Sequence, residues 1–339
     1  WGDLYVSLAA LAEVCELHSE VVLIGSEKWK DLIDPRTWPK VNEIWVSEDG
    51  WTCERFAWHN DEWVSAGPSA LRAQLRRVHT SYNLRTESLR YGWAPALARV
   101  PARHGSAPFP WDHLLYTHRA PWLGKDPRIH ERDRLLQVVE APDRIGELVK
   151  VWKLKSGLPI LRKVDRSNGE RVANAKAGTY FLVNPTSSRR EKAWPSAQFQ
   201  RLVETLLPLL EQRQLTLRVI GAPTESVWLR ETLPEGLSER EFLVQPAKNS
   251  DLCDVLSGAV GLLTNASSMQ FLAASYDITT VTLTGRGDRV IWGPLGSRDV
   301  IVQGTVDRAL DAKIFEQERA AYESLPFDRV LEACLRIIG

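Results

Sequence analysis

The chain has 339 residues, of which 44% are hydrophobic and 25% charged, with 43 basic and 43 acidic residues. This composition excludes a disordered or fibrous protein, and the length fits two α/β domains of ordinary size. No apolar run approaches the roughly 20 residues that cross a bilayer, and the four cysteines are scattered without a CxxC pair. We therefore expect a cytoplasmic protein with no disulfide framework and no zinc site.

The charge is unevenly distributed along the chain. Between Ala70 and Leu135 there are 12 Lys and Arg residues against 5 Asp and Glu residues. A basic patch of this kind suits an anionic acceptor or an anionic membrane surface, so peripheral membrane contact is expected. A solvated, arginine-rich helix face would give the same count. No nucleic-acid-binding module accompanies the patch, and we expect no nucleic acid partner.

The first half of the chain is predicted to begin with a helix, because leucines recur on one side of residues 4–17. A strand and a glycine-rich turn normally precede such a helix in an α/β unit, so we expect the sequence to be incomplete at its start. Strands are predicted at residues 21–24, 43–46 and 82–84, and a short helix at 130–139. Residues 99–125 are predicted to be loops, and the polar stretch 155–178 to connect two domains.

The second half alternates strands and helices. Strands are predicted at residues 180–183, 215–220, 242–244, 260–263 and 279–283, and helices at 196–212, 226–233, 250–257 and 267–276. This alternation predicts a parallel sheet with helices on both faces. The predicted domains are residues 1–160 and 178–325, followed by a C-terminal helix, 326–339, that packs back on the first domain.

Lys192 lies on the loop between the strand predicted at Tyr180–Val183 and the helix that begins at Ser196. Open α/β sheets bind ligands at the carboxyl ends of their strands, and a cation there suits a phosphorylated ligand. The alternative is a solvated loop lysine. The chain has no Asp-x-Asp pair for a divalent ion and no HExxH motif, so no metal site is expected.

Several segments, in order, resemble the heptosyltransferase family, glycosyltransferase family 9. They are Trp1 to Leu11, Asn83 to Ser88, His130 to Arg132, Asn184 to Pro195, Gly221 to Glu225, Thr264 to Ala274, Gly285, and Trp292 to Pro294. The resemblance implies an α/β protein of the GT-B type, with two Rossmann-like domains facing each other across a cleft. It implies a glycosyltransferase without a cofactor that moves heptose from ADP-heptose to a lipopolysaccharide-core or related glycan acceptor. It also implies inversion without a metal ion, in the cytoplasm at the inner face of the inner membrane.

The same resemblance assigns roles to individual residues. Asp3 matches the general base for the acceptor hydroxyl, and Lys192 matches the lysine that neutralises the donor diphosphate. The other residues expected to bind the donor are Thr186, Ser187, Arg189, Glu225, Asn265, Ser267, Ser268 and Gln270. Those expected to bind the acceptor are Arg85, Arg90 and His130. Asp3 and Glu225 also have a purely structural interpretation as acids in the first turn of a helix, and Asn265 as an N-cap.

Two positions depart from the family pattern. The family usually has Asp where this chain has Asn265, and His where it has Gln270. An amide keeps the hydrogen-bonding capacity of a carboxylate but not its charge. These departures motivate an alternative function, a non-catalytic nucleotide-sugar or glycan-binding protein on the same fold. A GT-B sugar epimerase, which needs no acceptor, is a third interpretation.

Overall fold

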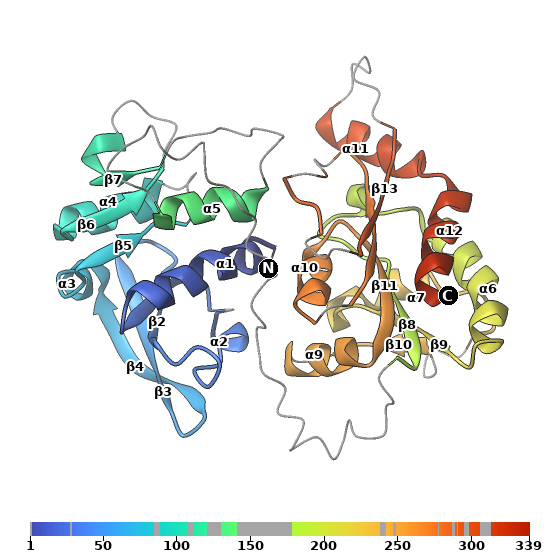
Figure 1. Ribbon diagram of the computed structural model, residues 1–339, viewed down its shortest axis with the longest axis horizontal. Coiled ribbons are helices and arrows are strands. Elements are labelled where there is room, and N and C mark those ends of the chain that lie inside the picture. Colours follow the sequence, from blue (N-terminus) through green and yellow to red (C-terminus); the bar gives the residue numbers. More distant parts are fainter. Residues whose placement is uncertain are drawn as a thin grey trace. The chain divides into compact units, whose positions relative to one another are not determined.

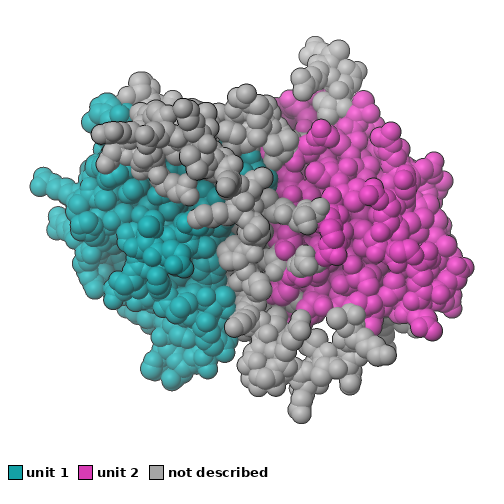
Figure 2. Space-filling model, in the orientation of Figure 1, with its two compact units in different colours: residues 1, 3–163 teal, residues 2, 164–339 magenta. Residues whose placement is uncertain are grey.

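The computed structural model of the chain describes residues 2–27, 29–84, 89–106, 112–120, 130–140, 178–237, 242–246, 249–276, 278–286, 289, 291–294, 298–305 and 313–339. The chain divides into two compact units, residues 1 and 3–163, and residues 2 and 164–339 (Figure 2). The elements of each unit are labelled in Figure 1. In the described part of the chain, no helix combines the length and apolar character that a membrane span requires.

Unit 1 begins with an α/β segment that ends in a long hairpin. Its elements are α1 (Gly2–Leu17), β1 (Val21–Gly25), α2 (Trp29–Leu32), β2 (Val41–Val46), β3 (Thr52–His59), β4 (Glu62–Ala70) and α3 (Leu71–Leu75). The strands form a sheet in the order β1-β2-β3-β4, in which β1 and β2 are parallel and the other two pairs antiparallel. The helix and the two strands predicted in this part of the chain are present, and the hairpin was not predicted.

The rest of unit 1 holds a second, smaller sheet. Its elements are β5 (Thr80–Tyr82), α4 (Leu89–Ala98), β6 (Ala102–Gly105), the 3₁₀ turn η1 (Asp112–Leu114), β7 (His118–Arg119) and α5 (Glu131–Glu140). The three strands are parallel, in the order β5-β6-β7. The prediction that residues 99–125 are loops is therefore wrong for β6 and β7. These strands are only four and two residues long, too short for a side-chain period to show in the sequence.

Unit 2 is built on a six-stranded parallel sheet in the order β10-β9-β8-β11-β12-β13. Its strands are β8 (Tyr180–Asn184), β9 (Thr216–Ile220), β10 (Leu243–Val244), β11 (Ala259–Asn265), β12 (Thr280–Thr284) and β13 (Val300–Gln303). Its helices are α6 (Ser196–Glu211), α7 (Ser226–Arg230), α9 (Asn249–Ser257), α10 (Ser268–Ser275), α11 (Ile314–Glu323) and α12 (Phe327–Ile338), with 3₁₀ turns η3 (Arg190–Lys192) and η4 (Pro223–Glu225). Figure 1 shows α9 and α10 on one side of this sheet and α6 and α12 on the other. The predicted α/β class with parallel sheets is confirmed.

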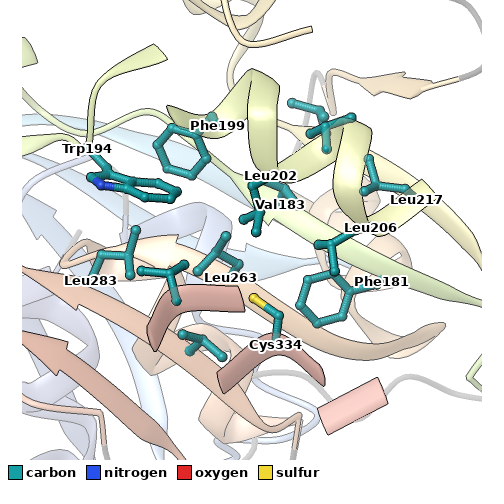
Figure 3. Close-up of a cluster of buried hydrophobic side chains, with 14 of the residues drawn as sticks. Phe181, Val183, Trp194, Phe199, Leu202, Leu206, Leu217, Leu263, Leu283 and Cys334 are labelled. Carbon is teal, nitrogen blue, oxygen red and sulfur yellow. The ribbon is translucent and has the colours of Figure 1, made fainter. Parts of the chain in front are cut away.

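The core of unit 2 lies between the sheet and the pair α6 and α12 (Figure 3). It includes Phe181 of β8, Phe199 and Leu202 of α6, and Val330 and Cys334 of α12, all buried. Every residue of β8 is buried, as expected for a central strand that is covered on both faces. The apolar face of α12 forms part of this core, so the C-terminal helix belongs to unit 2, and its predicted packing on the first domain stays a prediction. The amphipathic pattern of α12 showed that the helix buries one face, but not which sheet receives it.

Candidate functional site

Asn184, the last residue of β8, ties three strand ends together. Its side-chain Nδ2 donates to the carbonyl oxygen of Ile220, at the end of β9, over 2.8 Å. Its Oδ1 accepts from the hydroxyl of Thr264, on β11, over 3.0 Å. The carboxyl ends of three parallel strands are thus fixed at the edge of the sheet where ligands of α/β proteins bind.

The loop that follows β8 is anchored in the core by Trp194. This side chain is 1% exposed, meets Phe199 edge-on with ring centroids 5.2 Å apart, and stacks on Phe327 at 6.1 Å. The 3₁₀ turn η3 ends at Lys192, and only Ala193 separates it from Trp194. Lys192 is therefore held two residues from a fixed point of the core.

Lys192 is half-buried, and its ammonium group forms no salt bridge within 4 Å in the described part of the chain. Two arginines precede it. The guanidinium of Arg190 forms two hydrogen bonds with Glu231, of 2.5 and 3.0 Å, and lies over the ring of Trp228. Arg189 instead stacks on an exposed ring of α11, that of Phe315, at 4.4 Å. Lys192 and Arg189 therefore remain available to an anion, whereas Arg190 is already neutralised.

The side chain of Asn265, the last residue of β11, forms hydrogen bonds with both ends of the loop that carries Lys192. Its Oδ1 accepts from the backbone N–H of Trp194 over 3.0 Å, and its Nδ2 donates to the carbonyl oxygen of Pro185 over 2.6 Å. The residue has no exposed surface. Asn265 therefore joins the two ends of the Lys192 loop and acts on a ligand through that loop. Its predicted contact with the donor itself stays a prediction.

The N-cap of α10 is Ser267, so the alternative interpretation of Asn265 as a cap is also excluded. The hydroxyl of Ser267 accepts from the backbone N–H of Met269 over 3.3 Å and lies 3.1 Å from that of Thr264. Ser268 begins the helix and is half-buried beside it. The first N–H groups of a helix form a site that favours anions, and these follow the end of β11 directly.

Gln270 lies in the first turn of α10 with 2% of its surface exposed. Its Nε2 donates to the carbonyl oxygen of Trp292 over 2.7 Å, which holds the segment after β12 against the helix. Its Oε1 is buried and meets no donor among the described residues. The geometry gives Gln270 a role in fixing that segment, and its predicted contact with the donor stays a prediction.

Thr186 and Glu225 were predicted separately and are in direct contact. The Thr186 hydroxyl donates to Oε2 of Glu225 over 3.0 Å, and the backbone N–H of Ala222 donates to the same oxygen over 2.8 Å. The structural interpretation of Glu225 therefore holds for Oε2, which caps η4. Its Oε1 has no partner in the described part of the chain and is available to a hydroxyl group. Ser187 follows Thr186 and is half-buried.

Glu318 on α11 is the residue of this site that the sequence did not reveal. It is 9% exposed and accepts a hydrogen bond from the backbone N–H of Arg286, which follows β12. Burial raises the pKa of the Glu318 carboxyl, and the charges of Lys192, Arg286 and Arg189 oppose that rise. One signal was present, because Glu318 precedes the buried Ala321 and Tyr322 by three and four residues, in register with an apolar helix face.

The predicted residues of unit 1 are less fully described. Asp3 lies in the first turn of α1 and Arg90 in α4, but only their backbone is described, and Arg85 lies outside the described residues. His130 directly precedes α5, and its carbonyl oxygen accepts from the N–H groups of Asp133 and Arg134. The general base and the acceptor contacts therefore stay predictions.

Part of the basic region is a solvated helix surface and part is internal. Arg72, Arg76 and Arg77 are exposed along and after α3. Arg103 instead donates to the backbone oxygens of Leu115 and Val100 and is structural. The described residues also contain no cluster of His, Cys, Asp and Glu that could hold a metal ion.

Comparison with known proteins identifies a family over the second half of the chain. Residues 155–320 match the model of glycosyltransferase family 9 (heptosyltransferase). No sequence among curated proteins matches the chain.

Several solved structures share the fold of the whole chain. A family 9 glycosyltransferase from Veillonella parvula is 16% identical with a TM-score of 0.71, covering 99% of this chain and 94% of its own. The ADP-heptose lipopolysaccharide heptosyltransferase II of E. coli is 14% identical with a TM-score of 0.72, covering 99% and 95%. The E. coli heptosyltransferase WaaC, solved with ADP, is 16% identical with a TM-score of 0.62, covering 99% and 96%. The part of the chain that carries the Lys192 loop thus matches the family 9 glycosyltransferase model, the chain shares the GT-B fold of these structures, and the predicted resemblance to the heptosyltransferases is confirmed.

Proposed function

We propose that this protein transfers heptose from ADP-heptose to a lipopolysaccharide-core or related glycan acceptor. The observation that carries the proposal is the ammonium group of Lys192, which forms no salt bridge with the described residues and lies on a loop anchored at the carboxyl edge of a parallel sheet. Two structures of one relative support the choice of donor, since WaaC was solved with ADP and with ADP-2-deoxy-2-fluoro heptose. We place the reaction in the cytoplasm, at the inner face of the inner membrane.

In the proposed reaction the oxygen of an acceptor hydroxyl attacks the anomeric carbon of the donor sugar and inverts it. The bond from that carbon to the diphosphate oxygen breaks, and its electron pair remains on the diphosphate. Lys192 and the N–H groups at the start of α10 stabilise this charge, so the step requires no metal ion. The carboxylate of Asp3 takes the proton of the acceptor hydroxyl. Oε1 of Glu225 accepts a hydrogen bond from the donor's ribose.

The test is a transfer assay with ADP-heptose and a lipopolysaccharide-core acceptor, read by mass spectrometry, on the wild type and on Lys192→Ala and Arg190→Ala. We expect Lys192→Ala to lower kcat by about 10²–10³-fold, the usual effect of removing one group that stabilises a leaving charge. Arg190→Ala is the matched control, because its charge is already engaged by Glu231. Equal turnover of Lys192→Ala and the wild type would refute the role of Lys192.

The same assay separates the alternative function. A non-catalytic binder would bind ADP-heptose in calorimetry and yield no product with any acceptor. An epimerase would release a changed sugar without an acceptor.

A further inference from the structure

The charges of three cationic side chains of unit 2 act on one buried acid, Glu318. Arg189 and Lys192 come from the loop after β8, Arg286 follows β12, and Glu318 projects from α11, which packs against η3. Arg189 also stacks on Phe315, on the same helix as Glu318. Segments from three distant parts of the sequence are thus held around a single carboxylate.

The other titratable groups near Glu318 are engaged elsewhere. One turn further along α11, the hydroxyl of Tyr322 donates to the carbonyl oxygen of Leu283 over 3.2 Å, and burial raises the pKa of this phenol, so it stays neutral. Glu191 acts on Arg319, on the exposed side of the helix, where Arg319 pairs with Glu323 at 2.8 Å. Glu318 is therefore the acid that balances the cations of the loop within the part of the chain that the structure describes.

We propose that Glu318 is the internal counter-anion of Arg189, Lys192 and Arg286, and that it takes up a proton when a diphosphate binds to these cations. The proposal rests on the proposed function, because it assumes that the diphosphate of a nucleotide sugar occupies this place. Without ligand, the negative charge of the carboxylate offsets the mutual repulsion of these three positive charges.

A bound diphosphate changes this balance. Its negative charges are drawn to the same cations and oppose a second anion beside them, which favours the neutral form of the acid. The Glu318 carboxylate then accepts one proton from solvent and becomes a carboxylic acid, with no other bond made or broken. Because binding takes up a proton, the affinity falls as pH rises from below the pKa of free Glu318 to above its pKa in the complex.

The test is titration calorimetry of the wild type with ADP-heptose, without acceptor, in two buffers of equal pH and different ionisation enthalpy. The diphosphate of a nucleotide sugar is a diester and lacks the second phosphate pKa near about 6 that would obscure the measurement. We expect uptake of up to about one proton per site, and an affinity that decreases with pH across the same range. Glu318→Gln should bind ADP-heptose with neither effect. Glu323→Gln, on the same helix, should behave as the wild type.

A second variant keeps the proposal testable if Glu318→Gln does not fold. Arg286 is exposed, and its charge lowers the pKa of Glu318, so Arg286→Gln should move the pH range of proton uptake upward. Binding without proton uptake in the wild type would overturn the proposal and leave the proposed function intact, as would unchanged uptake in Glu318→Gln. Failure of the wild type to bind ADP-heptose would overturn both.

Discussion

Replacing Asn265 with Asp tests whether the amide closes the Lys192 loop. The carboxylate could still accept from the backbone N–H of Trp194, but it could not donate to Pro185, now 2.6 Å from Nδ2. A buried carbonyl that loses its donor costs about 1–3 kcal/mol, and a buried carboxylate beside it adds to that cost. We expect Asn265→Asp to lower the free energy of unfolding by about 3 kcal/mol at pH 8, or by about 6–12 °C in Tm for a unit of this size.

The pH dependence of this loss identifies its cause. Burial and the facing carbonyl raise the folded-state pKa of the new Asp above its unfolded value near about 3.9. The protonated acid can donate to Pro185, so stability is retained at low pH and lost as pH rises through the folded pKa. We expect the loss to shrink to about 1 kcal/mol at pH 5, measured by urea unfolding at both pH values.

The matched control is Asn60→Asp, the same chemical change at an exposed turn. It should alter stability by less than about 0.5 kcal/mol at either pH. A loss in Asn265→Asp that does not change with pH would refute the role of the donated hydrogen bond.

Three further substitutions separate the parts of the site. Trp194→Ala should lower the free energy of unfolding by about 3–5 kcal/mol in denaturant melts, because the ring is buried, and a loss below about 1 kcal/mol would contradict the anchoring role. Thr186→Val removes the hydroxyl that donates to Glu225; it should raise the donor KM about tenfold with kcat unchanged, and Thr186→Ser should restore it. Arg190→Ala breaks an exposed ion pair with Glu231 and should lower stability by less than about 1 kcal/mol in the same melts. A larger loss would mean that the pair fixes the loop.

Unit 2 could be predicted closely because its strands are short, apolar and regularly spaced. The strand predicted at 180–183 became β8 (Tyr180–Asn184), and the helix predicted at 196–212 became α6 (Ser196–Glu211). In a parallel sheet each strand is covered on both faces, so the pattern is a continuous apolar run with little ambiguity.

The hairpin of unit 1 escaped prediction for two physical reasons. A register shift between Arg55 and Phe56 interrupts the alternation of β3. Its turn is formed by Asn60 and Asp61, both with positive φ, without the glycine that usually marks such a turn. Neither feature leaves a two-residue period or an Asn-Gly pair in the sequence.

Individual residues of the candidate site could be predicted from the sequence, but the interactions between them could not. Lys192, Thr186 and Glu225 could be located because each follows a strand. The hydrogen bond of Thr186 with Glu225, 39 residues apart, and the electrostatic interaction of Lys192 with Glu318 depend on strand order, which one sequence does not reveal. For the same reason Asn265 was expected to touch a ligand, although its side chain is directed into the loop.

The two hydrogen bonds by which Asn265 holds the Lys192 loop also affect the entropy cost of binding a ligand. A segment fastened at both ends and pinned by Trp194 has few conformations to lose when it binds. Ordering a free loop costs about 1–2 kcal/mol per residue in backbone entropy, and a preorganised loop avoids most of that cost at the moment of binding. Breaking the hydrogen bond of Asn265 at either end of the loop should therefore lower the affinity of Lys192 for a ligand, although no group that contacts the ligand is changed.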